Sequence, residues 1–381
     1  MDLQVPRGFV AVFPGGPQLS FDPRPGQAAA LPATLVLLAL LLGGSLAQGA
    51  VQLPPGFRLE LYAEVPGARH LTVDERGTVW VGTMGKAVYA IPDANRDFKA
   101  DRVVKVLDGL NGPNGVAVQG DDVYVAEVDR IRRYPALART LGVPPNPVLV
   151  RNLPPERHHG YRVLRFGPDG LLYVSLGAPT NAGEVEDPYG TLARLKSDGQ
   201  GFEILARGIR NSMGFDWHPV SRELYFTDNG RDMLGDDLPP EELNRLTRVG
   251  QHFGFPYRFG NNQKDPEWGN RAPAGLTFTP AAVLMEAHVA PLGMRFYRGS
   301  MFPAAYKNQA FIAQHGSWNR STPLGYRVVT VQGSRATVFA HGWLQGRRVS
   351  GRPVDLQELS DGSVLVSDDY AGKVYRITYR R

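Results

Sequence analysis

Short apolar stretches recur along the chain, and each is followed by a polar turn and a second apolar stretch that carries one bulky side chain. Six copies follow this order, at residues 71–81, 116–125, 164–174, 215–226, 294–312 and 356–366. Asp-Gly and Arg-Gly turns between alternating apolar positions are typical of β-hairpins. The pattern therefore predicts an all-β fold built from one repeated unit.

The bulky residues of the second stretches set the period of the repeat. They are Trp80, Tyr124, Tyr173, Tyr225, Phe311 and Leu365, spaced by 44, 49, 52, 86 and 54 residues. A period of roughly 40–50 residues with several strands per unit indicates the blades of a β-propeller. We expect a six-bladed β-propeller over residues 51–381, with an insertion between blades four and five at about residues 229–285.

Further strands are expected behind the repeated hairpins, at residues 87–91, 130–134, 326–331 and 373–377. Residues 53–65 are expected to supply a strand that closes the ring with the last blade. The 44 glycines and 31 prolines are spread evenly, which agrees with many turns between short strands.

Charge and cysteine content exclude some functions. The chain carries 42 Lys and Arg against 37 Asp and Glu, and its net charge is +5. There is no run of five or more basic residues, so nucleic-acid binding, which needs a clustered basic stripe, gains little support. The absence of cysteine excludes disulfides, thiolate metal sites and Cys nucleophiles.

Residues 1–50 are interpreted as a leader. Residues 28–47 are nearly uncharged and end in small residues, which is typical of a secretory signal peptide. The long Pro- and Gly-rich start would be explained by a misassigned start codon. We expect an exported protein, periplasmic or extracellular, without a membrane span in its mature form. The alternative is an uncleaved anchor, since about 20 apolar residues span a bilayer.

A polar segment with two histidines, His158 and His159, precedes the third copy of the repeat and has no counterpart in the others. An imidazole at the opening of a propeller is a candidate proton acceptor. Arg210, Arg320 and Arg352 each lie near a strand end that is expected to face the axis. Because arginine grips carboxylates with a planar fork, the three are expected to converge on a multiply charged anion. A surface ion pair is the alternative for any one of them.

Residues 227–246 form an oxygen-rich loop that suits calcium, which accepts carboxylates and backbone carbonyls. Within it, Glu241 and Glu242 are expected in a solvated turn that leads into a short helix. The remaining histidines have no zinc-site spacing.

Several motifs together resemble the glucose/sorbosone dehydrogenase family, whose members are exported, six-bladed quinoproteins that bind pyrroloquinoline quinone (PQQ). The resemblance is strongest to the L-sorbosone dehydrogenase-like branch and the soluble aldose dehydrogenases, and it covers about residues 54–378. The motifs lie at residues 159–175, 208–219, 231–238, 254–257, 290–293, 315–320 and 351–353.

The resemblance implies a role for individual residues. His159 matches the general base that takes the hydroxyl proton from the anomeric carbon of a sugar while hydride passes to the quinone. Gly230 and Arg231 match residues whose backbone carbonyls bind calcium. Positions that match the cofactor site are Arg210, Asn211, Asn229, Asn319, Arg320 and Arg352, whereas Val354 stands where relatives have a further arginine. The sugar side is matched loosely by Asn111, Asn114 and His158.

The expected function is thus PQQ- and calcium-dependent oxidation of an aldose or sorbosone-like sugar, with an external electron acceptor, by a monomer or homodimer. Two alternatives remain open at this stage. A propeller lactonase would need Glu, Asn and Asp side chains around an axial metal. A non-catalytic propeller would bind a glycan or a partner protein through the same loops.

Overall fold

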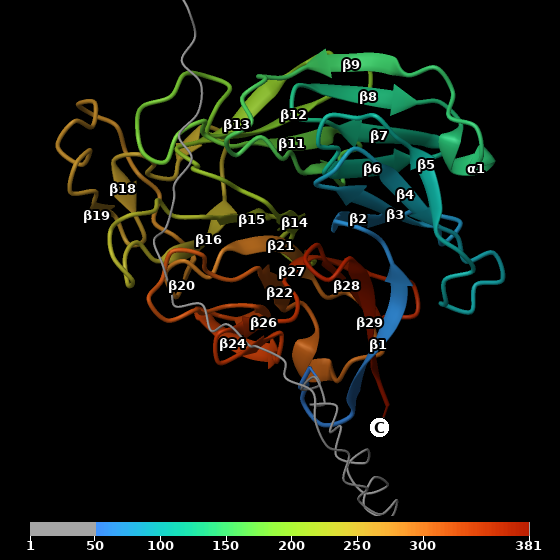
Figure 1. Ribbon diagram of the computed structural model, residues 1–381. Helices are drawn as coiled ribbons and strands as arrows, with labels where there is room; N and C mark the ends of the chain where they lie inside the picture. The colour runs from blue at the N-terminus through green and yellow to red at the C-terminus, as the bar shows by residue number, and fades with distance from the viewer. Residues whose placement is uncertain (1–50, 381) are drawn as a thin grey trace, which may run out of the picture. The chain divides into compact units, whose positions relative to one another are not determined.

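The computed structural model describes residues 51–380, and they fold as a six-bladed β-propeller. Figure 1 shows six sheets around a common centre, with the strands β2 (Ala68–Val73), β14 (Phe215–Trp217) and β27 (Pro353–Glu358) towards the middle. The predicted all-β class and blade number are confirmed. The expected signal peptide lies outside the described residues. Within residues 51–380, no helix has the length and apolarity needed to cross a bilayer.

The four core strands of each blade form an antiparallel sheet, and in blades one to five the first of them in sequence lies nearest the axis. Blade one contains β2, β3 (Val79–Thr83), β4 (Val88–Ile91) and β5 (Val104–Leu107). Blade two contains β6 (Gly115–Gln119), β7 (Asp122–Ala126), β8 (Arg130–Tyr134) and β9 (Val148–Asn152), with the short helix α1 (Leu137–Thr140) before β9. Blade three contains β10 (Leu164–Phe166), β11 (Leu172–Leu176), β12 (Thr191–Leu195) and β13 (Glu203–Arg207), extended by β17 (Gln251–His252).

The second half of the ring repeats this order. Blade four contains β14, β15 (Leu224–Asp228), β16 (Glu241–Leu246) and β20 (Val283–Met285). Blade five contains β21 (Pro291–Phe296), β22 (Ala310–Gln314), β23 (Arg327–Gln332) and β24 (Arg335–Ala340), with a 3₁₀ turn at Ala304–Tyr306. Blade six contains β27, β28 (Val364–Asp368), β29 (Lys373–Tyr379) and β1 (Phe57–Glu64). Two hairpins are added outside the blades, β18 (Arg258–Phe259) with β19 (Gln263–Lys264), and β25 (Leu344–Gln345) with β26 (Arg348–Val349).

All six bulky residues that set the period lie on the second strands of their blades. Apolar side chains fill the space between each pair of neighbouring blades, giving six clusters around the ring. Trp80 packs between blades one and two, while Leu71 of blade one shares a cluster with Leu365 of blade six. The core is therefore continuous around the axis, because burial of apolar area between sheets joins every blade to the next.

Strand β1 closes the ring, as predicted. It pairs antiparallel with β29, so that Phe57 lies opposite Tyr379 and Leu59 opposite Ile377. The N-terminal strand thus becomes the outer strand of a blade otherwise made by the C-terminal residues. This pairing ties the two ends of the repeat together.

The extra residues in the second half lie inside blade four, which corrects the expected insertion between blades four and five. Within residues 229–285, β16 and β20 are the third and fourth strands of that blade. The added segments are residues 229–240 and 247–282. The spacing of the second-strand residues could not reveal this, because it counts only the residues between one second strand and the next.

Replacing Phe57 with Ala should lower the free energy of unfolding by about 2–4 kcal/mol, since the ring loses aromatic packing at the closing strand. Phe57 makes edge contacts with Phe302 and Phe339 at centroid distances of 4.8 and 4.9 Å. Urea unfolding measures the change. Tyr370→Ala, which removes a side chain of a residue that is 62% exposed, is the control and should stay within about 0.5 kcal/mol. Equal effects of the two changes would contradict the role of this packing.

Candidate active site

A cavity of about 320 Å³ lies where the inner strands begin, and we call it the amino-end cavity. Its volume is in the range of small-molecule sites. Blades one, three, four and five supply its walls. The lining residues used below are Arg69, Arg157, His159, Arg210, Asn211, Asn229, Gly230, Asp232, Glu241, His288, His315, Trp318 and Asn319.

His159 enters this cavity in a single tautomer. Its Nδ1 lies 2.7 Å from the carbonyl oxygen of Ala178, and a carbonyl accepts hydrogen bonds only. Nδ1 therefore carries the proton, and in the neutral ring the lone pair is left on Nε2. The arrangement is the one a general base requires.

Burial keeps this imidazole neutral. It lowers the pKa of His159 to about 3, and the positive charge of Arg210 and the neighbouring His158 act in the same direction. The backbone at His159 has a φ of 52°, and a Cβ on Gly177 would come within 2.6 Å of the His159 Cβ. Only a glycine at 177 allows the ring to approach β11 so closely.

Asp228, the last residue of β15, holds the loop that carries Arg210 and Asn211. Its two carboxylate oxygens accept the backbone N–H groups of these residues at 3.0 and 2.7 Å. Burial raises the pKa of Asp228 to about 6, while the N–H donors oppose the shift. The loop is thus fixed in position by a buried acid rather than by apolar packing alone.

The same contact recurs in other blades. Asp368, the last residue of β28, accepts the N–H of Arg352 at 2.9 Å. Glu127, directly after β7, accepts the N–H of Asn111 at 2.7 Å. An acid at the end of the second strand therefore fixes the loop that leads into the inner strand of its own blade.

A polar network joins the other side chains around the cavity. Asp232 accepts hydrogen bonds from Arg210 at 2.8 Å and from the Asn319 amide at 2.6 Å. On the opposite side, Asp369 accepts from Arg69 at 2.5 Å and from His315 at 2.8 Å, and these donors contribute to lowering its pKa to about 2. The carboxyamide oxygens of Asn211 and Asn319 are buried without a partner in the described chain. These two oxygens are free to contact a ligand.

Glu241 and Glu242 lie in strand β16 and are buried, so the expected solvated turn and helix are wrong. Glu241 accepts the N–H of Gly230 at 2.7 Å, and Glu242 accepts an amide hydrogen bond from Asn244 at 2.9 Å. Burial raises the pKa of both carboxyl groups to about 8. The sequence alone favoured exposure, because carboxylates are rarely buried, and the backbone donors of Gly230 and Gly260 reach them only in the folded blade.

Side chains alone do not form a metal centre here. Between residues 51 and 380, no three His, Cys, Asp or Glu residues gather in a way that could hold an ion. The acid nearest to Gly230 is Glu241, which leaves room for a site built on backbone carbonyls and one carboxylate.

The family model of the glucose/sorbosone dehydrogenases matches residues 146–376. This chain belongs to the glucose/sorbosone dehydrogenase family. An uncharacterised protein of Borreliella burgdorferi is 33% identical over 352 residues, covering 87% of this chain and 91% of that protein. A pyrroloquinoline quinone-dependent pyranose dehydrogenase of Coprinopsis cinerea is 26% identical over 317 residues, which cover 70% of this chain and 42% of the fungal protein.

Solved structures agree with the fold. The holo PQQ domain of the Coprinopsis cinerea pyranose dehydrogenase has a TM-score of 0.73 at 19% identity, covering 86% of this chain and 97% of that domain. The PQQ-bound aldose sugar dehydrogenase of Streptomyces coelicolor has a TM-score of 0.60 at 17% identity, covering 86% of this chain and all of that one. The family's propeller is thus present throughout the described residues.

Half of the expected site residues line the amino-end cavity. His159, Asn211 and Asn229 do so, together with Arg210, Gly230 and Asn319. The side chain of Arg231 instead pairs with Asp265 at 3.0 Å. This pairing leaves open the role expected of its backbone carbonyl.

Of the three arginines expected to converge, Arg210 alone lines the cavity. Arg320 donates to the carbonyl oxygens of Asp236 and Ala287, and Arg352 donates to those of His315 and Gly316. Both arginines therefore donate to backbone carbonyl groups of neighbouring loops. The position of an arginine near a strand end in the sequence does not reveal such a contact.

The residues expected on the sugar side are divided. Asn114 is buried and accepts from Arg69 at 2.9 Å, and Asn111 accepts from Arg157 at 3.0 Å, so each amide contacts an arginine of the cavity wall without lining it. His158 is exposed, and its ring centroid lies 4.1 Å from that of His159.

Sequence reasoning missed several lining residues, namely Arg69, Arg157, Asp232, Glu241, His288, His315 and Trp318. Arg69 and Arg157 supply the positive charge that Arg320 and Arg352 were expected to bring. One signal was available for Arg69, because it lies at the start of an inner strand, just as Arg352 does. The other lining residues are in loops that come together only when the ring closes, and no regular spacing in the sequence links them.

Replacing Asp228 with Asn should lower the free energy of unfolding by about 1–3 kcal/mol, because one of the two backbone N–H groups loses its acceptor. Thermal or urea unfolding measures the change. Asp237→Asn removes a carboxylate whose side chain is 90% exposed, and should be nearly neutral. An Asp228 variant as stable as the Asp237 variant would show that the loop does not need this acid.

The neutral state of His159 can be observed directly in ¹⁵N-histidine-labelled protein. Because its folded pKa lies below the unfolded value, the ring should bind no proton as the pH falls from 8 to about 4. Its ¹⁵N shifts should report a proton on Nδ1 and a bare Nε2. The resonances are assigned with His159→Gln. A titration midpoint near 6.5, or a proton on Nε2, would contradict this assignment.

Proposed function

We propose that this protein oxidises the anomeric carbon of an aldose or sorbosone-like sugar with PQQ and Ca²⁺ as cofactors. One observation carries the proposal: a neutral imidazole with its tautomer fixed by Ala178 faces a cavity beside the guanidinium of Arg210. The fungal relative named above is described as a PQQ-dependent pyranose dehydrogenase, and this supports the same class of reaction.

His159 is proposed as the general base. Its Nε2 would accept the proton of the hydroxyl on the anomeric carbon. The hydrogen bond to Ala178 holds the ring in place and stabilises the Nδ1–H form before and after the proton arrives. Arg210 disfavours protonation of His159 before the substrate proton is transferred, because its positive charge lowers the pKa of the ring.

The residues of the amino-end cavity fit a polycarboxylate cofactor. Three guanidinium groups, of Arg69, Arg157 and Arg210, line it against two acids, Asp232 and Glu241. The buried carboxyamide oxygens of Asn211 and Asn319 would accept hydrogen bonds from N–H or O–H groups of a bound ligand. When bound, PQQ supplies the two-electron acceptor for the hydride that leaves the sugar.

Calcium is proposed beside Gly230. The backbone carbonyls of Gly230 and Arg231 would be ligands, and Glu241 would supply a carboxylate nearby. The raised pKa of Glu241 supports this, since a buried carboxyl group without a strong cationic partner gains stability when a cation approaches.

The remaining expected residues are proposed in supporting roles. Arg352 holds the carbonyls of His315 and Gly316, and Arg320 holds those of Asp236 and Ala287, so both fix loops that border the cavity. Asn229 accepts a hydrogen bond from Arg210 through its carbonyl oxygen at 3.2 Å. At the rim, Trp318 is 72% exposed and offers an aromatic face to a sugar ring.

Replacing His159 with Ala should lower kcat by about 10²–10⁴-fold, because the proton acceptor is lost. Purified protein is loaded with PQQ and Ca²⁺, and sugar-dependent bleaching of a redox dye is followed. PQQ affinity, measured by fluorescence quenching, should change little.

His158→Ala is the matched control, since this neighbouring ring is exposed and should be dispensable for the proton transfer. If the His159 variant keeps the wild-type rate, the base is assigned wrongly. If wild-type protein bleaches no dye with any aldose, the proposed activity is wrong, and a binding propeller becomes the better explanation.

A further inference from the structure

A second cavity, of about 390 Å³, lies where the inner strands end, and we call it the carboxyl-end cavity. All six blades line it. The inner strands contribute Thr72, Ala117, Arg165, Asp216 and Gln357, and Arg298 lies two residues after the end of β21. The amino-end cavity lies at the starts of these strands, so the two cavities occupy opposite ends of the central channel.

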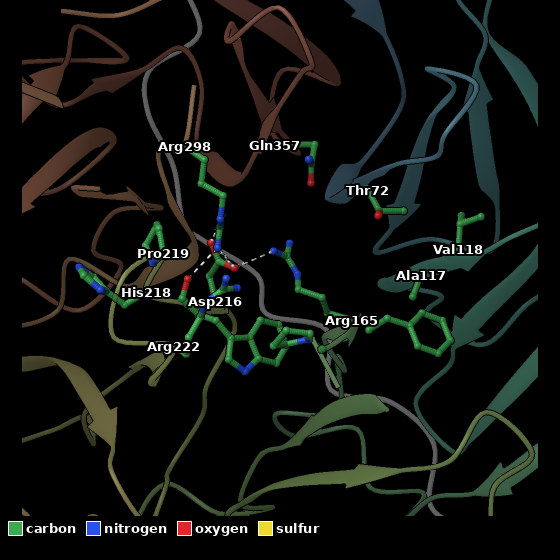
Figure 2. A pocket seen from close by; sticks show the side chains of 14 residues that line it. Thr72, Ala117, Val118, Arg165, Asp216, His218, Pro219, Arg222, Arg298 and Gln357 are labelled. Carbon is green, nitrogen blue, oxygen red and sulfur yellow. Dashed lines mark hydrogen bonds and ion pairs between the residues drawn. The ribbon is translucent and has the colours of Figure 1, made fainter. Parts of the chain in front are cut away.

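Positive charge is in excess in the carboxyl-end cavity. Arg165, Arg222 and Arg298 line it against a single carboxylate, that of Asp216. Figure 2 shows Arg165 and Arg298 reaching Asp216 from different sides, with Thr72 and Gln357 across the opening.

Asp216 and Arg298 form an ion pair with two hydrogen bonds. The carboxylate accepts from Nη1 and Nη2 of Arg298 at 2.8 and 3.0 Å, and from the N–H of Phe296 at 2.8 Å. The same two nitrogens also donate to the carbonyl oxygens of Phe296 and Trp217. This pair therefore forms a fixed wall and has little hydrogen-bonding capacity left.

The guanidinium of Arg165, by contrast, has hydrogen-bond donors that no protein group uses. Its closest charged partner is Asp216 at 3.6 Å, and it donates no hydrogen bond to any residue between 51 and 380. Its side chain is 16% exposed and none of its nitrogens is buried without a partner, so its unpaired donors are accessible from the cavity. Arg222, at the rim, has no ion pair within the same residues either.

We propose that the carboxyl-end cavity is a binding site for a phosphate-class oxyanion, free or as an ester, with Arg165 as its central contact. The guanidinium fork matches two oxygens of such an anion, and Arg222 and the hydroxyl of Thr72 would complete the contacts. Phe166 and Trp217 give the cavity apolar walls that an organic ester could contact. This site does not depend on the proposed dehydrogenase function.

Titration calorimetry with inorganic phosphate and with glucose 6-phosphate, at constant ionic strength and without quinone, tests the proposal. Wild-type protein should bind one equivalent of at least one of them. Arg165→Gln should weaken binding by about 10–100-fold, because a charged hydrogen-bond donor is lost, and Arg165→Lys should restore part of it. Binding of the ester alone would identify the anion as an organic phosphate.

Two further variants keep the test informative if Arg165→Gln fails to fold. Arg222→Gln changes an exposed side chain and should weaken binding by a smaller factor. Arg157→Gln changes an exposed arginine of the amino-end cavity and should leave the affinity unchanged. The proposal is overturned if neither anion binds, or if Arg157→Gln weakens binding while the Arg222 and Arg165 variants do not.

Discussion

Buried carboxylates at the ends of second strands are the contact on which the candidate site depends. Asp228 holds the backbone of Arg210 and Asn211, Asp368 holds that of Arg352, and Glu127 holds that of Asn111. Each acid is buried, so its charge must be offset by N–H donors, and only one loop conformation supplies them. The burial of charge thus fixes the loops from which cavity residues project.

The two ends of the channel use charge differently. At the amino end, acids such as Asp232 and Asp369 are interleaved with arginines, and the network fixes Arg210, while the Ala178 carbonyl holds His159. At the carboxyl end one acid is already saturated by Arg298, and Arg165 is left with donors to spare. A balanced network suits the placement of reacting groups, whereas an excess of donors suits capture of an anion.

Sequence reasoning was accurate where the signal repeats. Six bulky second-strand residues gave the blade number, and residues 53–65 were rightly expected to close the ring. His159 was singled out because its polar segment breaks the repeat, and its ring lines the amino-end cavity, while its role as a base stays a prediction. The errors concern residues that occur in only one copy of the repeat. Glu241 and Glu242 were expected in a solvated turn but lie buried in β16. Arg320 and Arg352 were expected in the cavity but donate to carbonyl groups of loops far along the chain.

The sequence by itself determined the strands, the number of blades and the membership of the family. The strands and the blade number follow from alternation of apolar and polar residues and from local turns, which act over a few positions. Family membership follows from the resemblance of the motifs between the strands. Only the closed ring decided which arginines share a cavity, which acids are buried and which nitrogen of His159 is bare. Those properties depend on desolvation and on donors from other blades, and neither exists until the sheets pack around the axis.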